Sequence, residues 1–214
     1  MEPHNDICCY LDGRGRGRAG GRTFGDVTVV TIRGVTSLEQ VSWLVMLVQV
    51  PSEPSRHRVA VWRELRRFGA VPVGQGAWTA PDVPACREGA EKAKELARTG
   101  NGELLLFTTG PADDDAARLR ELFNAARADE WAEFVADCGK FTDEIAREIA
   151  KQKFTLAELE EEEQSLDRLR RWFRAIRTKD VFGSPAAASA DQKLAACTEA
   201  LDGFAALVYG EVHS

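Results

Sequence analysis

The densest apolar run of the chain covers Trp43–Val50, in which seven of eight residues are apolar and three are β-branched. The run is short, and Pro51 ends it. Short apolar runs that stop at a proline are typical of strands buried on both faces, whereas a helix needs a longer pattern. The hydrophobic core is therefore expected to begin with a strand at these positions.

A helical pattern follows this strand directly. Val61, Leu65 and Phe68 are separated by four and three residues, so they lie on one face of a helix. Pro54 suits the first turn, because an N–H at that position has no partner within the helix, and Gly69 suits the residue after the last turn. The pattern predicts an amphipathic helix between Pro54 and Gly69.

Two more strands, a second helix and a last strand complete the pattern. Ala70–Val73 and Ala77–Ala80 are short strand segments joined through two glycines, which accept positive φ. Asp82 is placed to cap a helix that runs to about Arg98, and Glu103–Thr109 is again an apolar strand segment. The order β-α-β-β-α-β is that of the ferredoxin-like fold.

The segment after the last strand starts with three consecutive carboxylates, Asp113–Asp115. Carboxylates favour a helix N-terminus, so a helix is predicted that ends near Arg127. Consecutive residues on a helix point in different directions, which favours a charged first turn over a metal site. Glu130–Ala136 could be an edge strand or part of a helix, and its partial alternation favours the strand.

From Thr142 onward the periodicity is helical, and Thr155 with Glu158 has the spacing of a capping box. Two apolar seams follow: Leu159, Leu166, Leu169, Phe173 and Ile176, then Leu194, Cys197, Leu201, Phe204 and Val208. Because Asp180–Pro185 separates the seams, the two helices are expected to pack as a long hairpin. The predicted fold class is α+β, a ferredoxin-like domain followed by a C-terminal helical region.

The first 40 residues differ in composition from the rest of the chain. They contain the paired Cys8 and Cys9 and an arginine- and glycine-rich run over Gly13–Arg22, but few apolar positions. Three interpretations stay open: a leader that is not translated, a solvated tail, and an arm that binds RNA. The chain therefore divides into a disordered or mispredicted leader (1–40), a ferredoxin-like α+β domain (41–137) and a helical region (138–214).

Several short motifs, taken in order, resemble the N-terminal domain family of the chromate-resistance regulator ChrB. They are the Trp-Leu strand ending at Pro51, the helix motif Arg58-x-x-x-Trp62-Arg63-x-Leu65, the Gly69-Ala70 break, the Ala77-Trp78-x-x-Pro81 strand, the segment Arg177-x-Lys179-Asp180-x-Phe182-Gly183 and the last helix ending at Tyr209. The resemblance extends from about Ser42 to Val212 and rests on the order and spacing of the motifs. A looser similarity is to the middle domain of the phenylacetate-degradation repressor PaaX.

The resemblance to ChrB implies a cytoplasmic, non-enzymatic regulatory or sensing protein linked to resistance to chromate or similar oxyanions. Regulators of this family carry a further C-terminal domain associated with the chromate response, and the chain ends at Ser214 without room for it. That departure adds an alternative, an interaction or dimerisation module that acts with a partner carrying the missing domain. The candidate partners are DNA, a chromate-domain protein and a second copy of the chain.

Composition argues against several other classes of protein. A net charge of −6 over 214 residues does not suit a protein that coats nucleic acid, although a local basic face is compatible with it. No apolar run approaches the roughly 20 residues that span a bilayer. The five cysteines form no C-x-x-C pair and the three histidines are scattered, so no metal and no cofactor is predicted. Cys138 and Cys197 are expected to be small buried residues.

No spacing typical of a nucleophile, an acid–base pair or a phosphate-binding loop is present, so no catalytic residue is predicted. His57 follows an arginine in the first turn of the first helix. A histidine in that position is expected to be solvated or locally hydrogen-bonded, and not to act as a catalytic base. The protein is therefore not expected to be an enzyme.

The remaining candidate site is a basic face on the first helix, where residues 53–67 hold five arginines and two glutamates. The arginines are Arg56, Arg58, Arg63, Arg66 and Arg67. At about 100° per residue, three of them (56, 63 and 67) form a stripe opposite the apolar side. The stripe can hold nucleic-acid phosphates or a free oxyanion, and the alternatives are a solvated helix face or an ion-pair partner for Glu160–Glu163. Trp62, beside the stripe, is expected to matter for stability and Arg63 for binding.

Overall fold

The computed structural model describes residues 41–110 and 114–213, all of them in one unit that begins at Thr36. The leader over 1–40, with its paired cysteines and its Gly13–Arg22 run, lies outside the described residues, and so does Asp113. The division of the chain at residues 40 and 137 therefore stays a prediction.

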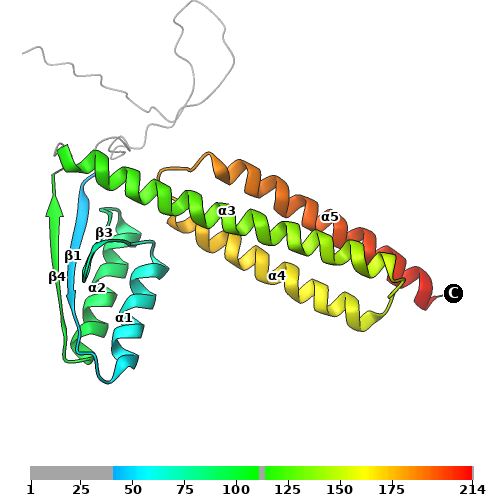
Figure 1. Cartoon of the computed structure of the whole chain (residues 1–214), viewed down its shortest axis with the longest axis horizontal. Coiled ribbons are helices and arrows are strands. Elements are labelled where there is room, and N and C mark those ends of the chain that lie inside the picture. The colour runs from blue at the N-terminus through cyan, green and yellow to red at the C-terminus, as the bar shows by residue number, and fades with distance from the viewer. Residues whose placement is uncertain (1–40, 111–113, 214) are drawn as a thin grey trace, which may run out of the picture. The chain divides into compact units, whose positions relative to one another are not determined.

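Four antiparallel strands form a sheet in the order β2-β3-β1-β4 (Figure 1). They are β1 (Trp43–Gln49), β2 (Val71–Gly74), β3 (Ala77–Pro81) and β4 (Glu103–Thr109). Leu44 of β1 pairs with Ala80 of β3 on one side and with Thr108 of β4 on the other, so β1 is a central strand. This order, with one helix between β1 and β2 and one between β3 and β4, is the predicted ferredoxin-like arrangement.

Helices α1 (Ser55–Arg67) and α2 (Pro84–Thr99) pack together on one face of the sheet (Figure 1). The cap predicted at Asp82 is wrong, because Val83 precedes the first turn and no side chain caps it. The Asp82 carboxylate instead accepts a hydrogen bond from Arg87 Nε at 2.9 Å. With Pro84 in the first turn, one of the N–H groups that a cap would satisfy is missing.

The opposite face of the sheet is only partly covered by the described residues. At one end Trp43 is buried against Phe123, with ring centroids 6.0 Å apart. Farther along the strands Leu47, Leu105 and Phe107 on the same face are exposed. We call this side the open face; it presents apolar groups to solvent, which is unusual for an antiparallel sheet with one solvated side.

Helix α3 runs without a break from Asp114 to Ala150. The edge strand predicted at Glu130–Ala136 is therefore wrong, and the helix does not end near Arg127. Buried residues along α3 recur every three or four positions: Phe123, Arg127, Trp131, Phe134, Cys138, Phe141 and Ile145. A window of seven residues samples too little of this period to separate it from partial alternation.

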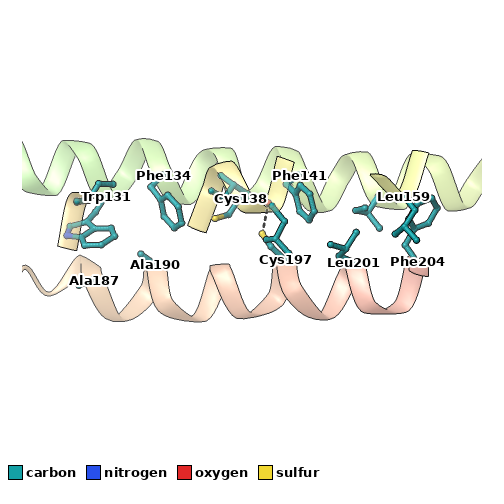
Figure 2. Packing of buried hydrophobic residues seen from close by; sticks show 14 of the residues in the cluster. Trp131, Phe134, Cys138, Phe141, Leu159, Ala187, Ala190, Cys197, Leu201 and Phe204 are labelled. Atoms are coloured by element: carbon teal, nitrogen blue, oxygen red, sulfur yellow. Dashed lines mark hydrogen bonds between the residues drawn. The ribbon is translucent and has the colours of Figure 1, made fainter. Parts of the chain in front are cut away.

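Helices α4 (Leu156–Lys179) and α5 (Ala186–Val212) complete a three-helix bundle with α3. Figure 2 shows the row from Trp131 to Phe141 on α3 facing the row from Ala187 to Phe204 on α5. Every residue of the two predicted seams is buried or packed against this core. The hairpin between the helices is confirmed.

Two local predictions are also confirmed in the bundle. Thr155 Oγ1 accepts a hydrogen bond from the Glu158 backbone N–H at 3.3 Å, which is the N-cap half of the predicted capping box, whereas the Glu158 carboxylate accepts from Lys153 Nζ. Cys138 and Cys197 are both buried, and the Cys197 Sγ donates to the Cys138 carbonyl at 3.5 Å (Figure 2). The two thiols therefore behave as small core residues.

Candidate functional site

Helix α1 presents all five predicted arginines, Arg56, Arg58, Arg63, Arg66 and Arg67, to solvent. The orientation of the helix follows from Val61 and Leu65, which are each 1% exposed and lie in the core beneath the sheet. Burying this apolar side turns the opposite side of the helix outward. The structure thus brings the predicted site residues together on the exposed side of one helix, which we call the arginine face.

Arg67 is held by an ion pair within α1. Its Nε donates to Glu64 Oε2 at 2.9 Å and its Nη2 donates to Oε1 at 2.5 Å. Lys92 Nζ of α2 lies 3.4 Å from the same carboxylate. These cations, with the Arg67 hydrogen bond as the largest cause, lower the pKa of Glu64 despite its burial. Arg67 is therefore largely neutralised, and the predicted stripe loses one of its three members.

Trp62 is 50% exposed, so the expectation that it is a buried structural residue is wrong. It lies four residues after Arg58 and four before Arg66, and the three form one row along α1. The Arg66 guanidinium carbon is 5.5 Å from the Trp62 ring centroid, which is within cation–π range. The spacing of four residues indicated this row in the sequence, but our interpretation placed the indole with the structural side.

A small cavity of about 160 Å³ lies beside this row. Arg58 and Trp62 line it together with residues that are almost all apolar: Val48, Val50, Val61, Leu65, Gly76 and Trp78. It is smaller than the roughly 300 Å³ of ordinary ligand pockets. The arrangement joins cations and an exposed aromatic ring, which are the groups that contact phosphates and stack on bases in nucleic-acid complexes.

Arg56 and Arg63 form no ion pair with any acidic group in the part of the chain that the structure describes. Arg56 Nε donates to His57 Nε2 at 3.3 Å, so the histidine has the local hydrogen bond that was predicted. No ion pair links α1 to Glu160–Glu163 among the described residues, which leaves that alternative without support. Glu162 instead is 6% exposed inside the bundle, where burial and neighbouring glutamates raise its pKa.

The segment around Lys179 and Asp180, which carries part of the family resemblance, has a structural role. Lys179 Nζ lies 2.6 Å from Glu130 Oε2 of α3. The Trp131 indole Nε1 donates to Asp180 Oδ2 at 3.0 Å, and the same carboxylate accepts the Ser184 backbone N–H. These contacts fix the turn between α4 and α5 against α3.

The same region joins the helical bundle to the sheet. Arg127 Nη1 of α3 donates to the Gly69 carbonyl at 2.9 Å, and the Phe182 ring lies 5.9 Å from the Trp43 ring. Gly69 has φ +88°, and a Cβ there would lie 2.8 Å from Arg127 Nη1, so only glycine fits. The Gly69-Ala70 break and the Phe182-Gly183 pair, which are far apart in sequence, therefore meet at one junction.

Within residues 41–110 and 114–213, no group of three or more His, Cys, Asp or Glu side chains could hold a metal ion. Over the same described ranges, no helix is long and apolar enough to cross a membrane. The arginine face is thus the candidate site with the most distinctive chemistry, and it is suited to binding anions.

Comparison with known proteins agrees with the sequence motifs. A sequence model of the family described as "Protein ChrB, N-terminal" matches residues 58–214. Protein ChrB of Cupriavidus metallidurans is 27% identical over 163 residues, which cover 75% of this chain and 46% of that protein. The chain thus spans about half the length of the curated relative. No solved structure gives a significant match.

Proposed function

The chain belongs to the ChrB N-terminal family, and from this premise we propose that it acts as a non-enzymatic regulatory or sensing domain in resistance to chromate or a related oxyanion. We further propose that the arginine face of α1 contacts DNA phosphates. The single observation that supports this contact is the set of exposed arginines on one helix of a chain whose net charge is −6.

The charges on α1 differ in how available they are. Arg67 is paired with Glu64, whereas Arg56, Arg58, Arg63 and Arg66 have no carboxylate partner among the described residues. A guanidinium without a carboxylate partner can donate to a phosphate without first losing an ion pair. These four residues are therefore the ones proposed to make the contacts, with Trp62 beside them as a surface for stacking.

The test is a salt series. Binding of the protein to DNA from upstream of its own gene would be measured by fluorescence anisotropy. Neutralising phosphates releases condensed counterions, so the logarithm of the affinity should fall by about 0.9 per contact for each unit of log salt concentration. The variant Arg56→Ala/Arg63→Ala/Arg66→Ala should reduce this slope by about two to three units.

A matched control removes the same charge elsewhere. Arg118, Lys140 and Arg147 are exposed and each is paired with an acidic residue three positions away. Replacing these three with alanine should leave the slope near that of the parent, because they lie on α3. Equal slopes for both triple variants, or no binding by the parent at physiological salt, would contradict direct DNA contact through α1.

Free chromate and a DNA phosphate share the chemistry of a tetrahedral oxyanion, so a second arm separates them. Titration of the DNA-free protein with chromate, followed by calorimetry, measures the free anion alone. A heat of chromate binding that the parent shows and the Arg56→Ala/Arg63→Ala/Arg66→Ala variant lacks would assign the arginine face to the anion, provided that the parent does not bind DNA. DNA binding that chromate does not displace would assign it to the nucleic acid.

A second candidate function is a module that binds another protein, including one that carries a chromate-responsive domain. The observation that favours it is the open face of the sheet, where Leu47, Leu105 and Phe107 are exposed. Purified protein that fails to bind DNA but forms a complex with such a partner would support this candidate.

A further inference from the structure

Strand β4 is an outer strand of the sheet with no protection on its free edge among the described residues. It pairs with β1 on one side only, and it spans seven residues without a proline or a bulge. The other outer strand, β2, has only four residues, contains Pro72 and has an irregular register. Proteins usually protect outer strands with prolines, bulges, charges or short length, because free N–H and C=O groups recruit further strands. β2 has the proline, the irregular register and the short length, whereas β4 has little beyond one charge at its start.

The surroundings of β4 are those of a strand-binding groove. Leu105 and Phe107, on the open face, are 44% and 51% exposed. On the helix side, Lys94 and Arg98 of α2 border a groove of about 350 Å³ that runs along residues 103–107. An added strand would therefore gain main-chain hydrogen bonds on the edge and apolar contacts on the open face.

We propose that β4 pairs antiparallel with β4 of a second copy of the chain, so that two sheets join into one. A two-fold axis perpendicular to the sheet keeps the open faces of both copies on the same side. Successive side chains along a strand point to opposite faces of the sheet. Two paired residues therefore lie on the same face only when their numbers are both odd or both even. An axis at Leu106 meets the condition and also pairs all seven residues of β4.

This register is self-complementary, which favours a second copy as the occupant. It places Leu105 opposite Phe107 of the second copy, an aliphatic–aromatic pair of the kind that stabilises adjacent strands. Glu103 meets Thr109 of the second copy, so no like charges are opposed. Both copies contribute the same surface patch to an interface about a two-fold axis, so that patch must be complementary to itself.

The charges of α2 also suit a two-fold arrangement. Glu91 lies 3.9 Å from Lys94 on the same helix, and Arg98 follows one turn later. Arg98 is likewise paired with Glu95 on α2, so the cations that border the groove present no excess of one charge to a second copy. Two identical helices can therefore approach across the two-fold axis without repulsion between like charges.

The first experiment measures the mass of the full chain in solution by sedimentation over a range of concentrations. We expect a concentration-dependent dimer for the parent and a monomer for Phe107→Lys, because a lysine at the free edge blocks strand pairing. Val73→Lys is the matched control: Val73 is 40% exposed but lies on β2, at the opposite edge. It should remain dimeric, and circular dichroism should show that both variants are folded.

The second experiment tests the register in protein whose Cys8 and Cys9 are replaced with serine. Mixing the Leu105→Cys and Phe107→Cys variants under mild oxidation should give more disulfide-linked dimer than either variant alone, because the axis at Leu106 places these two positions opposite each other. The native Cys86, Cys138 and Cys197 are buried and should not contribute.

Several results would overturn the proposal. The first is a parent protein that stays monomeric at all concentrations, and the second is a Phe107→Lys variant that remains dimeric. The third is a Val73→Lys variant that dissociates as much as Phe107→Lys does; this result would assign the contact to the open face and not to the edge. A monomer in which the β4 amides that point away from β1 are nonetheless protected from hydrogen exchange would show that a different occupant, such as residues 1–40, lies there.

Discussion

Replacing the buried Arg127 should destabilise the protein far more than replacing an exposed arginine on the same helix. Arg127 is 3% exposed, it donates to the Gly69 carbonyl at 2.9 Å and to Glu130 Oε1 at 3.0 Å, and its guanidinium carbon lies 4.8 Å from the Phe123 ring centroid. Burial lowers the pKa of the guanidinium and the charge of Glu130 opposes that change. Burying this charged group costs desolvation free energy, and the contacts with Gly69, Glu130 and Phe123 offset that cost.

The magnitude follows from what Arg127→Ala leaves behind. The Gly69 carbonyl loses its donor, at a cost of about 1–3 kcal/mol, and Glu130 loses a charged hydrogen bond of about 1.5–3 kcal/mol. Lys179, 2.6 Å from Glu130, still neutralises that carboxylate, so the two costs do not add fully. We expect a loss of about 3–5 kcal/mol in the free energy of unfolding, as for other buried pairs that lose one member.

Arg118 gives the control, because it pairs with Glu121 at the same spacing on α3 but both side chains are 69% exposed. Arg118→Ala should cost less than about 0.5 kcal/mol. Urea unfolding of both variants measures the difference, and the double variant Arg127→Ala/Glu130→Ala should show a coupling of at least about 0.5 kcal/mol. Equal costs for Arg127→Ala and Arg118→Ala would refute the argument that burial makes this pair important.

Two further predictions follow from burial. Trp62→Ala should lower the free energy of unfolding by only about 1 kcal/mol, because half of the Trp62 surface is already exposed. Trp131→Ala, at a fully buried position, should lower it by about 3–5 kcal/mol. Urea unfolding would show the contrast, and similar losses would mean that Trp62 is covered in solution. Desolvation first, then Glu144 and other glutamates, raises the pKa of Glu162 above its ordinary value of 4.5, so the folded protein binds this proton more tightly than the unfolded chain. Stability from this group is absent at neutral pH and is gained as the pH falls through the raised pKa, so Glu162→Gln should be more stable than the parent at pH 7 and should lose that advantage toward about pH 4. Unfolding curves over this pH range test the sign, and a difference that does not change with pH would contradict it.

Elements that depend on local spacing were predictable from the sequence. The strand that begins at Trp43 and stops before Pro51, the helix with Val61 and Leu65 on one side, and the cap by Thr155 all appear as expected. The exposure of the arginines follows from the same pattern, because burying one side of a helix turns the other side outward. The order of these elements was enough to indicate the ferredoxin-like sheet.

Tertiary contacts decided the rest, since they join residues that no local window contains. The continuity of α3 depends on α4 and α5 covering a row of residues that runs well beyond Glu130–Ala136. The exposure of Trp62 depends on which neighbours α1 has, and the burial of Arg127 depends on Gly69, 58 positions earlier in the chain. A sequence determines which side of a helix is apolar, and the spacing of three residues between Glu64 and Arg67 already allows their ion pair. The burial of Arg127, in contrast, depends on which distant groups the fold brings within a few ångströms.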